Sequence, residues 1–459
     1  MSQGIEDIGK RDIAWSYAAT FFTIGAGVLL LPFILNKLSA ETVGIWNIFQ
    51  TITAFVLLLD FGFRPSFARN VSYILSGVKQ LQKVGVNHVT AESSDIDYSL
   101  LKGTLHVMQR FYRWMALTVF VLLASVGTAY LCFILKKYSG NTTDAIIAWV
   151  ILIVINCYNL YTYYYDALLT GKGYVKRIQQ ITILGQSIYI LTAIALIYAG
   201  FGLIAIVSAQ LLSTVIRRVL AHRVFFDKKM KQALADAVPI EEKGIMGAIY
   251  PNALKVGLTY LGGFLVNRSA VLMGAAFLPL AEVASYGITV QIIDIIVRCG
   301  TVIYQSYTPK LAQYRAEQNY EQLRRLYKYS VLSLLTIIIA GGIVLIFGGK
   351  WALTFIKSDT TLLPTAMLCA MLVISLLENN HSIAAGFIMA DNKIPFFIPS
   401  LVSGFATIVI MWIMLYVFDM GIWAMILAPG IAQVAYQNWK WPYTIIKELY
   451  STHSQGNTK

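Results

Sequence analysis

Seven ionisable side chains lie within long apolar stretches of this chain, where a charge is costly to bury unless it has a partner or a role. The acidic ones are suited to take up a proton or Na⁺, and the basic ones are suited to hold an anion. Arginine grips phosphate with two donors at once, because its guanidinium is planar. Each is therefore a candidate functional residue; the basic ones are Lys255, Arg268 and Arg298, and the acidic ones are Asp60, Asp166, Asp294 and Glu378.

The densest polar interruption is Glu378-Asn-Asn-His381, four polar residues in a row inside an apolar stretch. A helix surface that faces lipid does not tolerate such a run, so this face looks into a cavity or onto a neighbouring helix. We predict that Glu378 binds a coupling proton or Na⁺, with His381 as a titratable neighbour. The competing interpretation is a structural pair between Glu378 and Lys255 or Arg298.

Local spacing offers simpler partners for two of the arginines. Arg298 follows Asp294 by one helical turn, so the two can pair on their own helix. Arg64 follows Asp60 by the same interval, which favours a salt bridge at a helix end. Arg64 can also form a basic entry for an anionic ligand together with Arg69.

The charged residues are set in an unusually apolar chain, with 57% hydrophobic and 13% charged residues. A soluble domain of this length would expose far more charge. Because about 20 apolar residues cross a bilayer as a helix, we predict an all-α polytopic membrane protein. Its twelve expected spans are 14–35, 43–63, 114–135, 145–168, 179–199, 201–221, 249–275, 283–307, 329–348, 363–388, 396–418 and 420–438.

Lysine and arginine alternate between the connecting segments. Most lie in every second segment, whereas the intervening loops hold only Lys37, Lys136, Lys137, Lys350 and Lys357. By the positive-inside rule, both termini are predicted to be cytoplasmic. The net charge of +13 therefore reflects membrane orientation, and we expect no nucleic-acid partner.

Depth sorts the charges within their spans. At about 1.5 Å of rise per residue, Lys255, Arg298 and Glu378 lie at similar depth, about 9 to 15 Å from their cytoplasmic ends. We predict that these three side chains face one cavity. Arg268 lies nearer the outer side, where it can accept a ligand late in transit.

The expected organisation is two lobes of six spans, 1–221 and 249–459, joined by a cytoplasmic linker, 222–248. The basic linker and the longer loop 65–113 are the only sizeable connections. That loop contains a predicted amphipathic helix that ends near Arg113. It either lies on the anionic inner leaflet or is a solvated connector.

An internal repeat supports the two lobes. Leu38-Ser-Ala-Glu-Thr-Val-Gly-Ile-Trp46 opens the second span, and the similar Leu280-Ala-Glu-Val-Ala-Ser-Tyr-Gly-Ile288 opens the eighth. The first segment, together with Leu59-Asp-Phe-Gly-Phe-Arg64 and the basic middle linker, resembles the Wzx-type polysaccharide and O-antigen flippases. These belong to the multidrug/oligosaccharidyl-lipid/polysaccharide (MOP) exporter superfamily, and the resemblance covers essentially the whole chain.

The resemblance implies a flippase of the bacterial cytoplasmic membrane. Its substrate would be an undecaprenyl-pyrophosphate-linked oligosaccharide, such as an O-antigen, capsule or exopolysaccharide repeat unit. Further expected partners are membrane lipids, a polysaccharide polymerase and a chain-length regulator. A pyrophosphate needs cations along a low-dielectric path. The assigned substrate-binding residues are Arg298, Lys255, Arg268 and Arg64, and the ion-coupling residues are Glu378, His381, Asp294 and Asp60.

Three other classes compete with this reading. A MOP-type exporter of cationic small molecules would need an acidic cavity, whereas the mid-depth residues here are largely basic. A membrane polymerase would carry a large outer loop, and a membrane acyltransferase would present His and Asp together. A channel would show a repeated filter-like loop. The sequence contains no phosphate-binding glycine loop, metal cluster or nucleophile constellation, so we expect neither an enzyme nor a cofactor beyond H⁺ or Na⁺.

Overall fold

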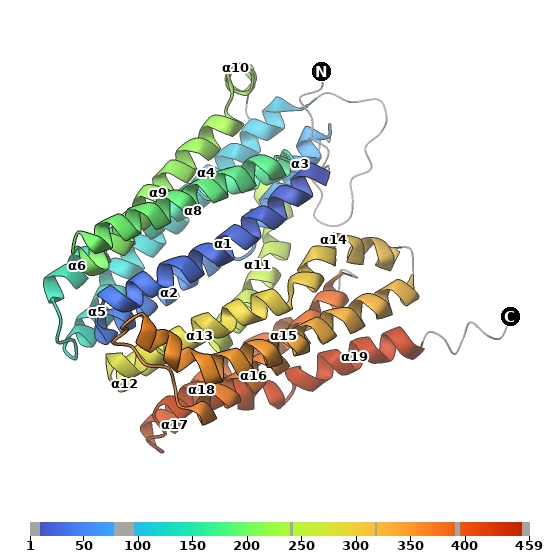
Figure 1. Ribbon diagram of the computed structural model, residues 1–459. Coiled ribbons are helices and arrows are strands. Elements are labelled where there is room, and N and C mark those ends of the chain that lie inside the picture. Colours follow the sequence, from blue (N-terminus) through green and yellow to red (C-terminus); the bar gives the residue numbers. More distant parts are fainter. Residues whose placement is uncertain (1–9, 78–95, 239–241, 317–318, 391–394, 452–459) are drawn as a thin grey trace. The chain divides into compact units, whose positions relative to one another are not determined.

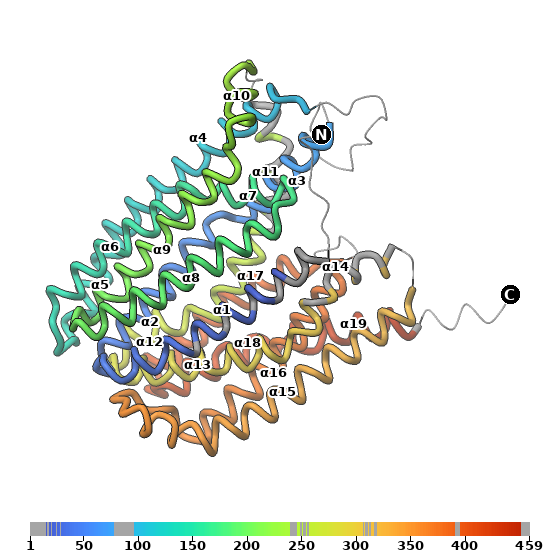
Figure 2. Tube along the Cα trace, turned by 45° about the horizontal axis from the view of Figure 1, so that its top comes forward, coloured from blue at the N-terminus to red at the C-terminus, as the bar shows by residue number. Residues whose placement is uncertain are grey.

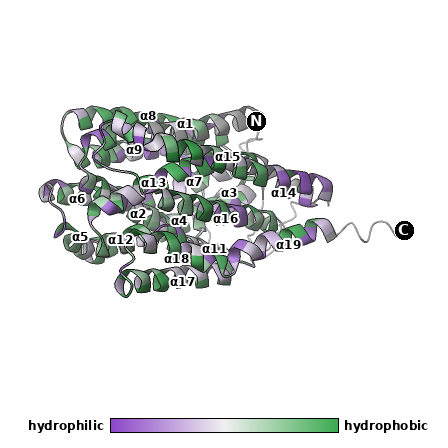
Figure 3. Ribbon diagram, turned by 60° about the horizontal axis from the view of Figure 1, so that its bottom comes forward, coloured by the Kyte–Doolittle hydropathy of each residue, from purple (hydrophilic) through white to green (hydrophobic). Residues whose placement is uncertain are grey.

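The computed structural model describes residues 10–77, 96–238, 242–316, 319–390 and 395–451, and its secondary structure over these residues is helical. This agrees with the apolar sequence, because a helix satisfies its own backbone hydrogen bonds inside a bilayer. Nine helices of the described chain are long and apolar enough to cross a membrane. Hydrophobic residues predominate along these helices (Figure 3).

The chain forms two compact units, which we describe separately. The first comprises Met1–Leu38 and Ile52–Leu258, and the second comprises Ser39–Thr51 and Thr259–Lys459. Helices that begin in the first unit, or end in it, are α1 (Lys10–Lys37), α2 (Ala40–Leu58), α3 (Phe63–Leu75), α4 (Tyr98–Leu122), the π-helical turn η1 (Leu123–Gly127), α5 (Thr128–Leu135), α6 (Thr142–Tyr161), α7 (Tyr164–Gly171), α8 (Val175–Tyr198), α9 (Gly202–Phe225), α10 (Lys228–Asp236) and α11 (Glu242–Asn267).

In the first unit the long helices pack in the spatial order α1, α8, α9, α6 and α4, so each lies beside the next (Figure 1). The short helices α3 and α7 pack against each other at one end of this bundle. A Cβ atom at Gly171 would lie 2.7 Å from both the Ala68 carbonyl oxygen and the Val71 side chain, so glycine permits this close approach.

Both α3 and α7 follow a break in a longer apolar helix. Between α2 and α3 the chain turns at Phe61 and Gly62, whose φ angles are 47° and 71°. Between α6 and α7 it turns at Thr162 and Tyr163. These breaks place Arg64, in the first turn of α3, close to Asp166, in the first turn of α7.

The second unit also contains the first residues of α2, the end of α11 and the remaining helices. In it, α15 packs on α13 and α16, and α16 also packs on α19 (Figure 2). The remaining helices of the second unit are α12 (Ser269–Phe277), α13 (Leu280–Gly300), α14 (Val302–Ala316), α15 (Tyr320–Phe355), α16 (Thr365–Met389), α17 (Phe397–Tyr416), α18 (Ile422–Val434) and α19 (Gln437–Ser451).

The two segments of the internal repeat contact each other in this second unit. Gly44 packs against the Leu280 backbone, and Gly287 packs against the side chain of Asn47. The side chain of Gln291 donates a hydrogen bond to the side-chain oxygen of Asn47 over 2.7 Å. The start of α2 therefore groups with the second unit, although in the sequence it lies well before the linker 222–248.

Nine of the twelve predicted spans correspond to membrane-length apolar helices of the described chain. The other three fall on α1, on α11 with α12, and on α18. Side chains of α1 and α11 are described only in part, α11 ends at Asn267, and α18 has 13 residues before the chain turns. The count of twelve and the cytoplasmic termini stay predictions.

The loop 65–113 is largely helical where it is described. Its first part forms α3, and its last part forms the start of α4, which continues without a break into the next predicted span. The polar section Asn87 to Asp97 lies almost wholly outside the described residues. Lys102 on α4 donates to the carbonyl oxygens of Ala237, at 2.7 Å, and Ala235, at 3.4 Å, and so ties the end of α10 to α4.

Candidate functional site

A cavity of about 300 Å³ lies within the first unit, between α3, α7, α8 and α9. Its lining combines polar, strongly basic residues with apolar ones. We call it the arginine cavity. The polar residues of its lining are Arg64, Asp166, Thr170, Thr182, Arg217 and Arg218, and the apolar ones are Pro65, Ala68, Leu169, Ile178, Ile181 and Ala221.

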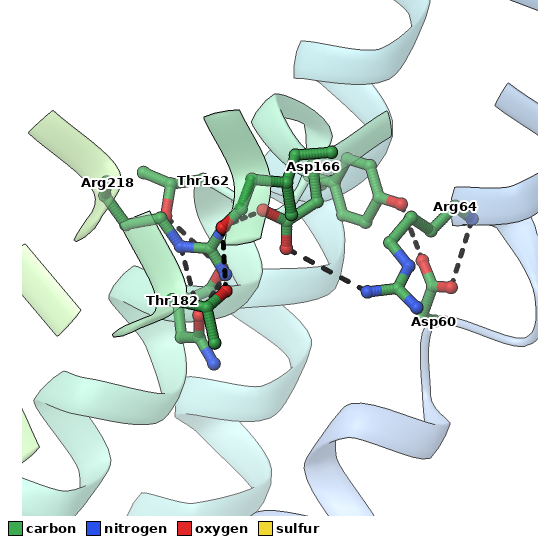
Figure 4. Close-up of polar contacts among 9 residues, drawn as sticks. Asp60, Arg64, Thr162, Asp166, Thr182 and Arg218 are labelled. Atoms are coloured by element: carbon green, nitrogen blue, oxygen red, sulfur yellow. Dashed lines mark hydrogen bonds and ion pairs between the residues drawn. The ribbon is translucent and has the colours of Figure 1, made fainter. Parts of the chain in front are cut away.

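Arg218 is the innermost cation of the cavity, with a side chain only 5% exposed. Its Nη1 donates to Asp166 Oδ1 over 2.8 Å, and its Nε donates to the side-chain oxygen of Asn159 over 3.2 Å (Figure 4). A second guanidinium nitrogen also contacts that oxygen of Asn159. A buried guanidinium with these partners is a fixed part of the structure, because moving it would leave buried polar groups unpaired.

Arg64 is held more loosely. Its guanidinium lies 3.9 Å from Asp166 Oδ2 (Figure 4). Its side chain is 46% exposed and lies over the ring of Tyr163, 4.9 Å from the ring centroid. Its backbone N–H donates to Asp60 over 3.0 Å, and Asp60 also accepts a hydrogen bond from Tyr112 over 2.6 Å. Asp60 therefore contacts Arg64 through the backbone at the start of α3, whereas the guanidinium is directed toward Asp166.

Arg217 is placed by the close packing of α8 on α9. The Ser213 hydroxyl donates to the Gly185 carbonyl oxygen over 2.7 Å, and the stem of Arg217 occupies the space that a Cβ at Gly185 would need. Within the part of the chain that the structure describes, no carboxylate forms an ion pair with Arg217. Among the described residues, Arg217 is therefore a cation of the cavity that lacks a direct ion pair.

The charge balance of the arginine cavity favours an anionic ligand. Among its described lining residues there are three arginines and one aspartate. Asp166 neutralises Arg218 directly, which leaves Arg64 and Arg217 able to bind a group with several acceptor oxygens. The described residues contain no cluster of three His, Cys, Asp or Glu side chains that could hold a metal ion.

A second charged cluster lies in the second unit, where α11 and α12 meet. Arg268 interrupts the helix with backbone angles of −125° and −20°, and its guanidinium pairs with Asp294 on α13 over 2.7 Å. Both side chains are 38% exposed. Asp294 thus pairs with Arg268 and not with Arg298, one turn away on its own helix.

Glu378 on α16 joins this pair. Its side chain hydrogen-bonds Asn267, and it interacts electrostatically with Arg268 and Asp294. The competing interpretation from the sequence pairs Glu378 with Lys255 or Arg298, whereas among the described side chains Arg268 is the cation that interacts with Glu378. We call Asn267, Arg268, Asp294 and Glu378 the acidic cluster, because it holds two carboxylates and one cation.

The other predicted site residues lie apart from the acidic cluster or are not described. His381 is buried and its Nδ1 lies 2.8 Å from the side-chain oxygen of Asn438, so it connects α16 to α19. Arg298 is exposed near the end of α13, and in the described chain it makes no ion pair. The side chain of Lys255 lies outside the described ones.

Sequence reasoning missed Arg217, Arg218 and Asn159 as site residues. The arginine pair lies at the cytoplasmic end of the sixth predicted span, 201–221, where lysine and arginine fit the positive-inside pattern without any further role. In the structure α9 continues to Phe225, and both arginines line the cavity instead of marking the end of the span. One signal in the sequence could have identified them. The Arg217-Arg218 pair lies in the same lobe as Asp166, an acid in an apolar span to which the sequence analysis assigns no partner.

No protein-family model and no curated protein sequence matches the chain. Solved structures do match it over nearly its whole length. One is a multidrug resistance MATE family transporter of the MOP superfamily in an inward-facing conformation, 14% identical, with a TM-score of 0.64 over 95% of this chain and 96% of that chain. An outward-facing structure of such a transporter is 16% identical, with a TM-score of 0.58 over 97% of each chain.

A third match is a MOP superfamily transporter from Pyrococcus furiosus, described as having a binding pocket of reverse polarity that suggests a different function. It is 14% identical, with a TM-score of 0.55 over 98% of this chain and 100% of that chain. At these identities the likeness establishes the fold. The chain has the fold of MOP superfamily transporters, and the matched structures are transporters rather than enzymes.

Proposed function

We propose that this protein is a flippase that moves an undecaprenyl-pyrophosphate-linked oligosaccharide from the cytoplasmic to the outer leaflet of the bacterial cytoplasmic membrane. The observation that carries the proposal is the arginine cavity in a chain with a transporter fold. A pyrophosphate enters a low-dielectric path only where cations replace its water, and Arg64 and Arg217 are suited to do so.

Ion coupling is assigned to the acidic cluster of the second unit. Glu378 and Asp294 are two carboxylates near a single guanidinium, so the cluster has an acidic group in excess. Such a site can take up a proton or Na⁺, and uptake changes the charge balance around Arg268. The proposed role of the cluster is to couple the ion gradient to transport, with Arg298 as a further substrate contact.

A MOP-type exporter of cationic small molecules is the alternative. A cationic substrate would gain nothing from a cavity in which arginines outnumber carboxylates, so the described charge favours an anionic substrate. The charges that line the cavity therefore distinguish an anionic from a cationic substrate, which the fold alone does not.

The proposal is tested with the purified full-length protein in proteoliposomes. A fluorescent undecaprenyl-pyrophosphate oligosaccharide is placed in one leaflet, and its arrival in the other is followed by quenching; a cationic dye is tested in parallel. We expect the lipid-linked sugar to cross faster than in empty liposomes and the dye not to cross. Transport of the dye alone would replace the proposal with the cationic exporter.

A further inference from the structure

The three arginines of the arginine cavity are bound to very different degrees. Arg218 has both an acid and an amide as partners and is almost fully buried. Arg64 lies 3.9 Å from Asp166, which is longer than a hydrogen bond, and is nearly half exposed. Arg217 interacts with Asp166 only at longer range and forms no ion pair with a carboxylate among the described residues. The cavity thus has one structural cation and two cations that a ligand can engage.

We propose that Asp166 acts as an internal substitute for a phosphate group, and that a phosphate joined to an apolar chain displaces it from Arg64. The phosphate oxygens would be held by Arg64 and Arg217, while Arg218 keeps Asp166 in place at the edge of the site. This inference deepens the proposed function and rests on it, since it assigns the recognition of the lipid phosphate to named side chains.

The geometry of Asp166 supports an exchange. Its Oδ1 binds Arg218 over 2.8 Å, whereas its Oδ2 is only 3.9 Å from Arg64. Loss of the second contact therefore leaves the first intact. A phosphate offers three or more acceptor oxygens and more charge than one carboxylate oxygen, so it binds two guanidinium groups more strongly than Asp166 binds one.

The lining indicates that the phosphate belongs to a lipid. Leu169, Ile178 and Ile181 form an apolar wall beside the arginines, and the fold belongs to proteins of the membrane. A free phosphate ion would leave this wall against water, whereas a lipid phosphate can cover it with the first carbons of its chain. The class of ligand is therefore an amphipathic phosphate ester.

The experiment measures binding of farnesyl phosphate to the purified full-length protein in detergent. Inorganic phosphate, farnesol and phosphatidylglycerol are the comparison ligands. We expect farnesyl phosphate to bind at least about tenfold more tightly than inorganic phosphate or farnesol, because each lacks one half of the recognised chemistry. Equal binding of inorganic and farnesyl phosphate would overturn the lipid assignment, and tighter binding of phosphatidylglycerol would assign the cavity to a membrane phospholipid instead.

Variants test the roles of the side chains. Arg217→Ala should weaken farnesyl phosphate binding by about tenfold or more, because it removes a charge-assisted contact. Arg217→Lys should retain part of the affinity. Arg223→Ala removes an exposed arginine from the same helix and should leave binding unchanged. Unchanged binding in Arg217→Ala would overturn the proposal.

Asp166→Asn gives the opposite sign. It keeps an oxygen for Arg218 but loses the charge that competes for Arg64, so affinity should rise by about tenfold. If Asp166→Asn has the unfolding temperature of wild type but binds farnesyl phosphate more weakly, the proposed exchange of Asp166 for a phosphate is overturned. If Asp166→Asn does not fold, the comparison of Arg217→Ala with Arg223→Ala decides. Because binding needs no transport, normal binding without flipping would refute the proposed function, and normal flipping without binding would refute only this site.

Discussion

The first unit surrounds its cavity with three arginines and one aspartate among the described residues, whereas the acidic cluster of the second unit sets one arginine among two carboxylates. Their accessibility also differs. The Arg218 side chain is 5% exposed, but Arg268 and Asp294 are both 38% exposed. The same kinds of side chain are therefore suited to two different chemistries, binding of an anion in one unit and of a cation or proton in the other.

The comparison also separates structural charge from available charge. In the first unit the deepest ion pair is satisfied, and the cations nearer the surface are in excess. In the second unit the ion pair itself is accessible, and Glu378 is close enough to perturb it. A charge is available for function when its partner can be exchanged. Mutations can measure whether a given charge stabilises the fold or takes part in transport.

The largest effect is expected from Arg218→Ala. It leaves Asp166 without its close partner and Asn159 without its donor, so stability should fall by about 3 kcal/mol. Thermal unfolding in detergent, followed by tryptophan fluorescence, measures the loss. Arg223→Ala removes an exposed arginine from the same helix and, as the control, should be near wild type. An Arg218→Ala protein as stable as wild type would show that the inner pair has no structural role.

Arg298 tests whether an exposed arginine of the second unit belongs to the substrate path. Arg298→Ala should lower flipping of the lipid-linked sugar by about tenfold or more, because a charge-assisted contact is lost. Arg298→Lys should keep part of the rate, since the charge remains but the two-donor grip does not. Full flipping by a normally expressed Arg298→Ala protein would remove this residue from the substrate path.

The smallest effect is expected at Lys102, a cation of the first unit that serves packing. Lys102→Met removes the bonds to the Ala235 and Ala237 carbonyl oxygens, so the attachment of α10 should weaken by about 1 kcal/mol. Limited proteolysis should then cleave the chain faster just after α10, with flipping unchanged. Lys228→Met, at an exposed position of α10, is the control. Equal cleavage of the two variants would rule out the attachment.

The fold class could be predicted from the sequence, because hydropathy and helix geometry alone produce long apolar helices. The positions of the breaks could not. Arg268 lies within a continuous apolar run, yet α11 ends just before it, and its guanidinium pairs with Asp294, a residue 26 positions away. Likewise, the contact between the repeat segments at Gly44 and Leu280 is tertiary and has no local signal.

The candidate site was predictable by residue type but not by pairing. Glu378, Asp294 and Arg268 were identified as costly charges in apolar spans, and the structure places them together. Spacing on one helix offered Arg298 as a partner for Asp294, but in the structure Asp294 pairs with Arg268. Arg217 and Arg218 were missed because a hydropathy window cannot say whether an arginine at a span end turns outward or into the bundle.

One measurement compares the two clusters in a single assay. Flipping of the lipid-linked sugar is recorded in proteoliposomes for wild type, Arg217→Ala and Glu378→Gln, over a range of substrate concentrations, with and without an imposed pH or Na⁺ gradient. We predict that Arg217→Ala raises the half-saturating substrate concentration by about tenfold but keeps the response to the gradient. Glu378→Gln should keep the half-saturating concentration and lose the response. If both variants change both quantities alike, the division of anion binding and ion coupling between the two clusters is contradicted.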